Sequence, residues 1–118
     1  MKTATKSELL SSLDQFTGTE QYYRHWTGSL LYTDGVKYLA DTAEAHWLID
    51  LIASYRRKEP FQVWTLKRDQ EGFGAVATMQ EDSGQPVLVR QVIEYTDFPL
   101  PEITLWLVDG VLILKSEY

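Results

Sequence analysis

Residues 104–115 read Thr-Leu-Trp-Leu-Val-Asp-Gly-Val-Leu-Ile-Leu-Lys, two short apolar runs that meet at Asp109-Gly110. Asp-Gly between β-forming residues is the strongest short-range signal for a β-hairpin, because a type I′ turn needs positive φ at both central positions. Successive pairs across such a hairpin point to opposite faces of the sheet. Counted outward from the turn, the facing pairs are Val108–Val111, Leu107–Leu112, Trp106–Ile113, Leu105–Leu114 and Thr104–Lys115.

Both faces of this hairpin are apolar. One face carries four leucines, namely Leu105, Leu107, Leu112 and Leu114. The other face carries Trp106, Val108, Val111 and Ile113. A hairpin with one solvated face would alternate apolar and polar residues, so both faces must be covered. We expect helices of the same chain on the leucine face and a protein partner or a second copy on the other. Trp64 is a further candidate for partner binding, because aromatic residues dominate interface hot spots.

The whole chain, residues 1–118, has the length of a single domain. Its 44% hydrophobic and 24% charged residues are ordinary for an ordered globular protein. It contains no cysteine, which excludes disulfides and thiolate metal sites and suits a reducing compartment. The sequence has no signal-peptide pattern, and no apolar run reaches the roughly 18 residues of a membrane span. We therefore expect a cytoplasmic protein without membrane contact.

The net charge of -6 is concentrated in the second half of the sequence. Residues 1–68 carry 9 basic and 8 acidic side chains, whereas residues 69–118 carry 2 basic and 9 acidic ones. An acidic surface repels nucleic acid and favours basic partners, so direct nucleic-acid binding is not expected. The acidity serves either to keep the protein soluble or to imitate nucleic acid in the basic groove of another protein.

Three segments carry helix signals. The first begins at the capping box Thr5–Glu8. In the second, Thr33 or Asp34 caps a helix with an apolar side. The third and strongest has a wide apolar surface over residues 45–55, and we expect the basic run Arg56–Lys58 in its last turn.

After Pro60 the apolar period changes from about 3.6 to 2, which is typical of strands. The predicted strands before the hairpin cover residues 61–67, 74–80 and 87–95, with a short extended segment at 21–26. Pro99 and Pro101 force an extended crossing that cannot lie inside a ladder. The chain is therefore predicted to be α+β, with N-terminal helices on one face of an antiparallel meander of about five strands ending in the Asp109-Gly110 hairpin.

The two histidines suggest one metal site. His46 and Asp50 are four residues apart on a predicted helix, so both lie on one face, and His25 is the obvious third donor. A metal-dependent hydrolase using these three residues is one possible reading. Two histidines and scattered carboxylates do not make a ligand motif, however, so an ordinary solvent-facing pair on the helix is favoured.

Two other groups of charged residues have structural explanations. Asp34 and Asp97 each follow Tyr-Thr and are candidates for acid/base work, but both also read as turn or cap residues. Arg56–Lys58, with Lys67 and Arg68, can form an anion-binding patch, although the acidic balance of the chain favours solvent-facing element ends. No phosphate loop, nucleophile elbow or dinucleotide motif is present, so neither an enzyme nor a cofactor is expected.

Several motifs spread over the chain resemble those of an uncharacterised family of small bacterial proteins that are often linked with phages and mobile elements. They are Phe16-Thr-Gly-Thr-Glu20, Tyr32-Thr-Asp-Gly-Val-Lys-Tyr-Leu-Ala40, Trp47-Leu-Ile-Asp50, Phe61-Gln-Val-Trp64 and Tyr95-Thr-Asp-Phe-Pro-Leu100. The resemblance implies a free-standing cytoplasmic domain and supplies no activity or site residues.

The sequence thus favours a non-catalytic protein-interaction module whose partner-binding residues lie on the second face of the hairpin. One alternative is an acidic inhibitor that imitates nucleic acid and blocks a host defence complex, of the anti-CRISPR or anti-restriction type. The other alternative is the metal-dependent hydrolase built on His25, His46 and Asp50.

Overall fold

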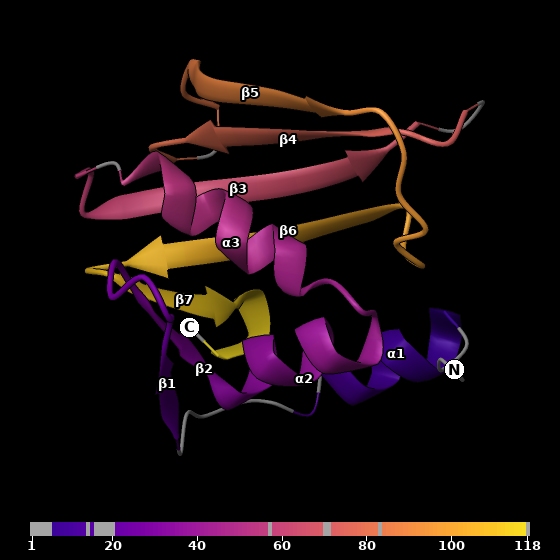
Figure 1. The fold of residues 1–118 in the computed structure, drawn as a ribbon, viewed down its shortest axis with the longest axis horizontal. Helices are drawn as coiled ribbons and strands as arrows, with labels where there is room; N and C mark the ends of the chain where they lie inside the picture. Colours follow the sequence, from indigo (N-terminus) through magenta and orange to yellow (C-terminus); the bar gives the residue numbers. More distant parts are fainter. Residues whose placement is uncertain are drawn as a thin grey trace.

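The structure is a computed structural model that describes residues 6–13, 15, 21–56, 58–69, 72–82 and 84–117. The helices are α1 (Lys6–Leu13), α2 (Asp34–Thr42), α3 (His46–Tyr55) and the short 3-10 helix η1 (Lys115–Glu117). The strands are β1 (Tyr22–Arg24), β2 (Leu31–Thr33), β3 (Phe61–Arg68), β4 (Ala75–Gln80), β5 (Val87–Ile93), β6 (Glu102–Val108) and β7 (Val111–Leu114). These elements form an α+β fold in which α3 lies across one sheet (Figure 1). The predicted capping residue Thr5 lies outside the described residues.

The sheet is mixed and larger than predicted. Within the described chain it has seven strands in the order β1-β2-β7-β6-β3-β4-β5. β2 runs parallel to β7, whereas the other strand pairs are antiparallel. The prediction of an antiparallel sheet of about five strands was therefore wrong in the strand number and in one pairing. β2 has only three residues, too few to show a period of 2, and its partner β7 comes about 80 residues later in the chain.

The hairpin of β6 and β7 has the predicted register for four of the five pairs, from Val108 opposite Val111 to Leu105 opposite Leu114. The fifth pair, Thr104 with Lys115, does not form, because Lys115 begins η1. Asp109 and Gly110 have φ angles of 50° and 84°, the two positive values that a type I′ turn requires. The hairpin does not end the sheet, because Leu31 of β2 pairs with Val111 on the outer side of β7. The Leu31 N–H also donates to the Gly110 carbonyl at 2.9 Å, so the turn itself anchors β2.

The connection from β5 to β6 passes the ends of β4 and β3 (Figure 1), so the predicted meander order was wrong. β6 pairs with β3 on the side away from β4. Phe98 and Leu100 on this connection are buried, and the Phe98 carbonyl accepts a hydrogen bond from the Arg68 guanidinium. The Arg68 N–H donates to the Pro101 carbonyl at 2.8 Å. The extended crossing predicted from the prolines therefore closes this end of the core.

All three α-helices pack against the leucine face of the sheet. The four leucines of that face share one buried cluster with apolar residues of α1, α2 and α3. Gly35 lies in the first turn of α2 where this contact is tight, because a Cβ there would stand 2.7 Å from Leu114 Cδ1. No helix in the described segments is long and apolar enough to cross a membrane.

The helix ends follow local chemistry. The Thr33 hydroxyl accepts the Val36 N–H at 3.2 Å, so Thr33 is the N-cap of α2, one of the two predicted capping residues. α3 ends at Tyr55 because Arg56 adopts left-handed backbone angles, with φ 50° and ψ 36°. The prediction that Arg56 and Lys58 lie in the last turn of this helix was therefore wrong, since both follow it.

Candidate interaction surface

The side of the sheet opposite the helices, which we call the open face, carries the second face of the hairpin. The ladder registers place Val63, Trp106 and Ile113 in one row across β3, β6 and β7, and Phe61, Val108 and Val111 in the next row. We call these six residues the hairpin patch. In the part of the chain that the structure describes, no helix packs against them. The structure thus brings together the four hairpin residues that the sequence suggested for partner binding.

Trp106 lies at the centre of the hairpin patch. Its row neighbours Val63 and Ile113 are only 6% and 8% exposed, although neither belongs to the core cluster beneath the helices. Trp106 stands between them in the ladder. The Phe61 ring meets the Trp106 ring edge-on, with centroids 5.5 Å apart. Side chains of the patch therefore cover one another in part and leave Trp106 half-buried.

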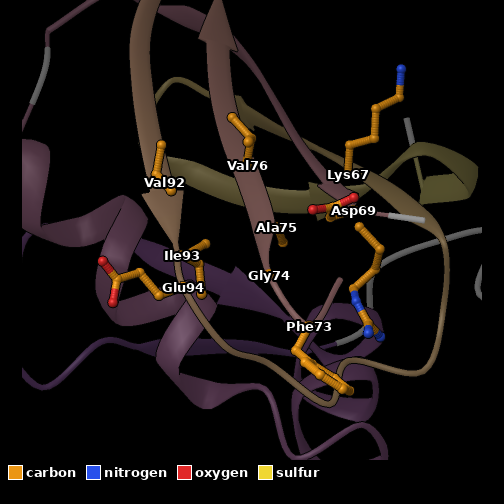
Figure 2. A pocket seen from close by; sticks show the side chains of 10 residues that line it. Lys67, Asp69, Phe73, Gly74, Ala75, Val76, Val92, Ile93 and Glu94 are labelled. Atoms are coloured by element: carbon orange, nitrogen blue, oxygen red, sulfur yellow. The ribbon is translucent and has the colours of Figure 1, made fainter. Parts of the chain in front are cut away.

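A row of threonines separates the hairpin patch from a groove at the other end of the open face. Thr65 and Thr104 face each other across β3 and β6, with hydroxyl oxygens 3.5 Å apart. Beyond them, the ends of β3, β4 and β5 line a groove of about 430 Å³. Its lining includes Lys67, Phe73, Val76, Val92 and Glu94 (Figure 2).

The edge strand β5, beside this groove, carries a concentration of exposed apolar side chains. Val87 and Leu88 at its start are exposed, and Val92 near its end is 54% exposed. Phe73 and Tyr95, just outside the ladder, are 71% and 70% exposed, with ring centroids 6.1 Å apart. Sequence reasoning missed this edge. The run of three apolar residues at 87–89 was a signal for this exposed edge. Alternate residues of a strand lie on opposite faces, so the three residues cannot all face the core.

Trp64, also predicted to bind a partner, lies on the other side of the sheet. It pairs with Leu105 of the leucine face and is 2% exposed. Its ring contacts Tyr55 of α3 at a centroid distance of 5.7 Å, and its indole N–H donates to the Gln62 side chain at 2.8 Å. The interpretation of Trp64 as a partner-binding residue was therefore wrong, because the side chain is a core residue with its polar atom satisfied.

The proposed metal ligands are divided between two places. His25, 4% exposed, lies with Nε2 2.7 Å from Asp50 Oδ1. Its Nδ1 accepts the Thr27 N–H at 3.2 Å and lies 2.7 Å from the Thr27 hydroxyl. The Trp26 indole donates to the same carboxylate oxygen at 3.3 Å. These bonds fasten the loop between β1 and β2 to α3.

His46 is not part of this cluster. Its Nε2 lies 2.6 Å from Asp41 Oδ1, at the junction of α2 and α3. The described residues contain no group of three His, Asp or Glu side chains placed to hold a metal ion. The metal site of His25, His46 and Asp50 was therefore wrong. His46 and Asp50 are both exposed on α3, as the favoured interpretation had them, although each bonds to a different residue.

Asp41 joins the two helices electrostatically. The Lys37 ammonium donates to Asp41 Oδ2 at 2.7 Å, and this bond, followed by the one to His46, lowers the pKa of Asp41 below its usual value. The same carboxylate raises the pKa of Lys37. Both side chains are exposed by 40% or more, so solvent weakens the pair.

The remaining charged candidates are far apart. Asp34 begins α2 next to β2, whereas Asp97 follows β5 at the opposite edge of the sheet, so they cannot act as one acid/base pair. Lys58 precedes β3 and Lys67 lies near its end, a separation of roughly 20 Å at the usual strand rise. The basic residues therefore form two small groups and no single patch.

The described carboxylates of the acidic second half also divide between the two ends of the strands. Asp69, Glu94 and Glu102 lie at the end of the sheet where β3 stops. Asp82 and Asp109 lie in turns at the opposite end. This spread does not favour the line of phosphate-like charges that a mimic of nucleic acid needs.

Comparison with known proteins gives one match. No curated protein and no solved structure is significantly similar to this chain. The model of a family of unknown function, DUF6876, matches residues 7–118. This range contains all of the motifs on which the resemblance to an uncharacterised family rests. The chain therefore belongs to the DUF6876 family, a family of unknown function.

Proposed function

We propose that this protein is a small, non-catalytic protein-interaction domain whose open face binds a protein partner through the hairpin patch. The observation that carries the proposal is the pair of apolar rows across β3, β6 and β7 on the side of the sheet away from the helices. Burial of apolar surface drives protein association, at about 25 cal/mol per Å². A partner that covers the patch would bury the apolar surface still accessible on its four half-buried members, Phe61, Trp106, Val108 and Val111.

The form of the patch favours a protein partner over a small ligand. The two rows lie on open strands, and the 430 Å³ groove is at the other end of the face. Leu31 extends the second row onto β2, where it pairs with Val111 and is exposed. An aromatic residue such as Trp106 among smaller apolar side chains, with polar threonines beside them, has the composition of an interface hot spot and its rim.

The charge and composition of the chain suggest the setting of this interaction. Residues 69–118 are strongly acidic, which favours a basic partner surface around the apolar contact. The absence of cysteine suits a reducing compartment such as the bacterial cytoplasm. The resemblance to proteins linked with phages and mobile elements suggests that the partner is a host or phage protein.

Site-specific photo-crosslinking tests the proposal. p-Benzoylphenylalanine at Val108, in the hairpin patch, should capture a partner in the host cell, whereas the same residue at Ser54, exposed on α3, should not capture it. With the purified partner, Val108→Lys should weaken binding about tenfold or more, because it places an unpaired charge in an apolar contact. Ser54→Lys should leave the affinity unchanged. Equal crosslinking from both positions, or none from Val108, would contradict the proposal.

A further inference from the structure

We propose that β5 is a homodimerisation edge, at which β5 of a second copy of this chain adds to the sheet in antiparallel orientation. This inference is independent of the proposed function, because it uses the edge of the sheet and leaves the hairpin patch free. The second copy would continue the seven-stranded sheet of the first across a two-fold axis, as isologous dimers do.

The position of β5 exposes its backbone. It is the last strand in the sheet order, and the described chain places no strand on its outer side. A seven-residue edge strand presents unpaired N–H and C=O groups that can bind another strand. The opposite edge, β1, has only three residues and offers much less backbone.

Several apolar side chains on and beside β5 are exposed to solvent and would be buried by a partner strand. Five large apolar side chains on β5 and its flanks are at least 41% exposed. They are Phe73, Val87, Leu88, Val92 and Tyr95. Natural edge strands in monomeric proteins are usually short or well charged, which prevents association. β5 carries one charged residue, Arg90.

Arg90 of β5 and Glu94, the first residue after the strand, together select one register. Thr78 pairs with Arg90 and Val76 with Val92, so Arg90 and Val92 lie on the same face, and Glu94 is the next residue of that parity. A two-fold axis at Arg90 would place two arginines opposite each other, which is destabilising. An axis at Gln91 would set Arg90 against an apolar valine. An axis at Val92 pairs residues 91–93 of the two strands and sets Arg90 opposite Glu94 of the second copy, the first residue after β5, twice by symmetry, with the two Val92 side chains opposite each other at the centre.

The groove adds contact area to this register. Val92 lines it together with Phe73 and Glu94, directly beside the axis (Figure 2). A stable interface buries about 1,200 Å² or more, which main-chain pairing of two short strands does not reach alone. The exposed apolar side chains and the groove supply further surface, so we expect a dimer with a dissociation constant on the order of micromolar.

Charge reversal tests the register. Sedimentation velocity of the full chain over about 1 to 200 µM should show a monomer–dimer equilibrium. Arg90→Glu and Glu94→Arg should each weaken the dimer about tenfold, because each turns two attractive pairs into two repulsive ones. The double variant Arg90→Glu/Glu94→Arg should restore an affinity within about threefold of the wild type. Tyr22→Glu, at the exposed opposite edge, is the matched control and should have no effect.

Each other outcome overturns the inference. A protein that is monomeric at every concentration would contradict the dimer. Single variants that dimerise as tightly as the wild type would show that β5 is not in the interface. Failure of the double variant to recover, with its fold intact by circular dichroism, removes the register. A dimer disrupted by Tyr22→Glu alone would move the interface to β1. The Val108 crosslink tests the proposed function separately, so the two proposals can fail independently.

Discussion

At the scale of single residues, Thr33 links the start of α2 to the end of the chain. Its buried hydroxyl accepts the Val36 N–H and donates to Glu117 Oε1 at 2.7 Å. Thr33→Ala removes both bonds, so we expect the free energy of unfolding to fall by about 1 to 2 kcal/mol in urea titrations. Thr33→Ser keeps the hydroxyl and should lose clearly less. Equal losses in the two variants would show that the methyl group, not the hydroxyl, matters.

Asp41, also at the residue scale, should make the free energy of unfolding depend on pH. Its pKa is lower in the folded chain than the unfolded reference of 3.8, chiefly because Lys37 donates to it. Such a carboxyl stabilises the fold above the unfolded pKa, and this stabilisation is lost as the pH falls through the folded pKa. Asp41→Asn should therefore be less stable than the wild type at pH 7, and the difference should shrink as the pH falls below the unfolded value of 3.8. A difference in unfolding free energy that stayed constant from pH 7 to pH 3 would contradict this assignment.

At the scale of elements, the β6–β7 turn can be tested directly. Gly110 has a φ of 84°, and a Cβ at this position would meet no other atom within 4 Å, so Gly110→Ala introduces backbone strain without a clash. We expect a loss of about 1 kcal/mol in thermal or urea unfolding. Asp109→Asn, the matched control, places a residue that tolerates positive φ at that position and should be neutral or slightly stabilising. A stability of Gly110→Ala equal to the wild type would argue against the type I′ turn.

The elements that were predictable are those with local signals. The hairpin follows from Asp-Gly and its flanks, and α3 follows from a long apolar period. β2 was missed because three residues carry no period, and because its hydrogen bonds go to a strand far along the chain. Trp64 and Trp106 look alike in the sequence. Only the register of β3 against β6, with Trp64 opposite Leu105, assigns them to opposite faces.

At the scale of the whole molecule, the order of strands could not be read from the sequence. Both a meander and the observed order use the same strands and turns, and the choice depends on which strand the crossing at residues 96–101 reaches. The open face was predictable in part, since the hairpin has two apolar sides. The β5 edge was not, because its exposure depends on that strand order.

The shape of the dimer distinguishes the edge from the face as the self-association surface. One copy measures 34 × 32 × 27 Å, and its strands succeed one another perpendicular to the longest axis (Figure 1). Small-angle X-ray scattering of the dimer should therefore show a particle extended in the plane of the sheet, with the 32 Å dimension roughly doubled. A particle thickened along the 27 Å direction would instead indicate two open faces stacked on each other.

The parallel pairing of β2 with β7 has a consequence for synthesis on the ribosome. β1 and β2 join the rest of the sheet only through β7, whose residues follow those of β2 by about 80 positions. At about 5 to 20 residues per second, the ribosome needs several seconds to add them. During that time the first two strands can pair only with each other, and the side of β2 that will pair with β7 stays exposed to chaperones and proteases. The last strand to be translated is thus the one that locks the first strands in place.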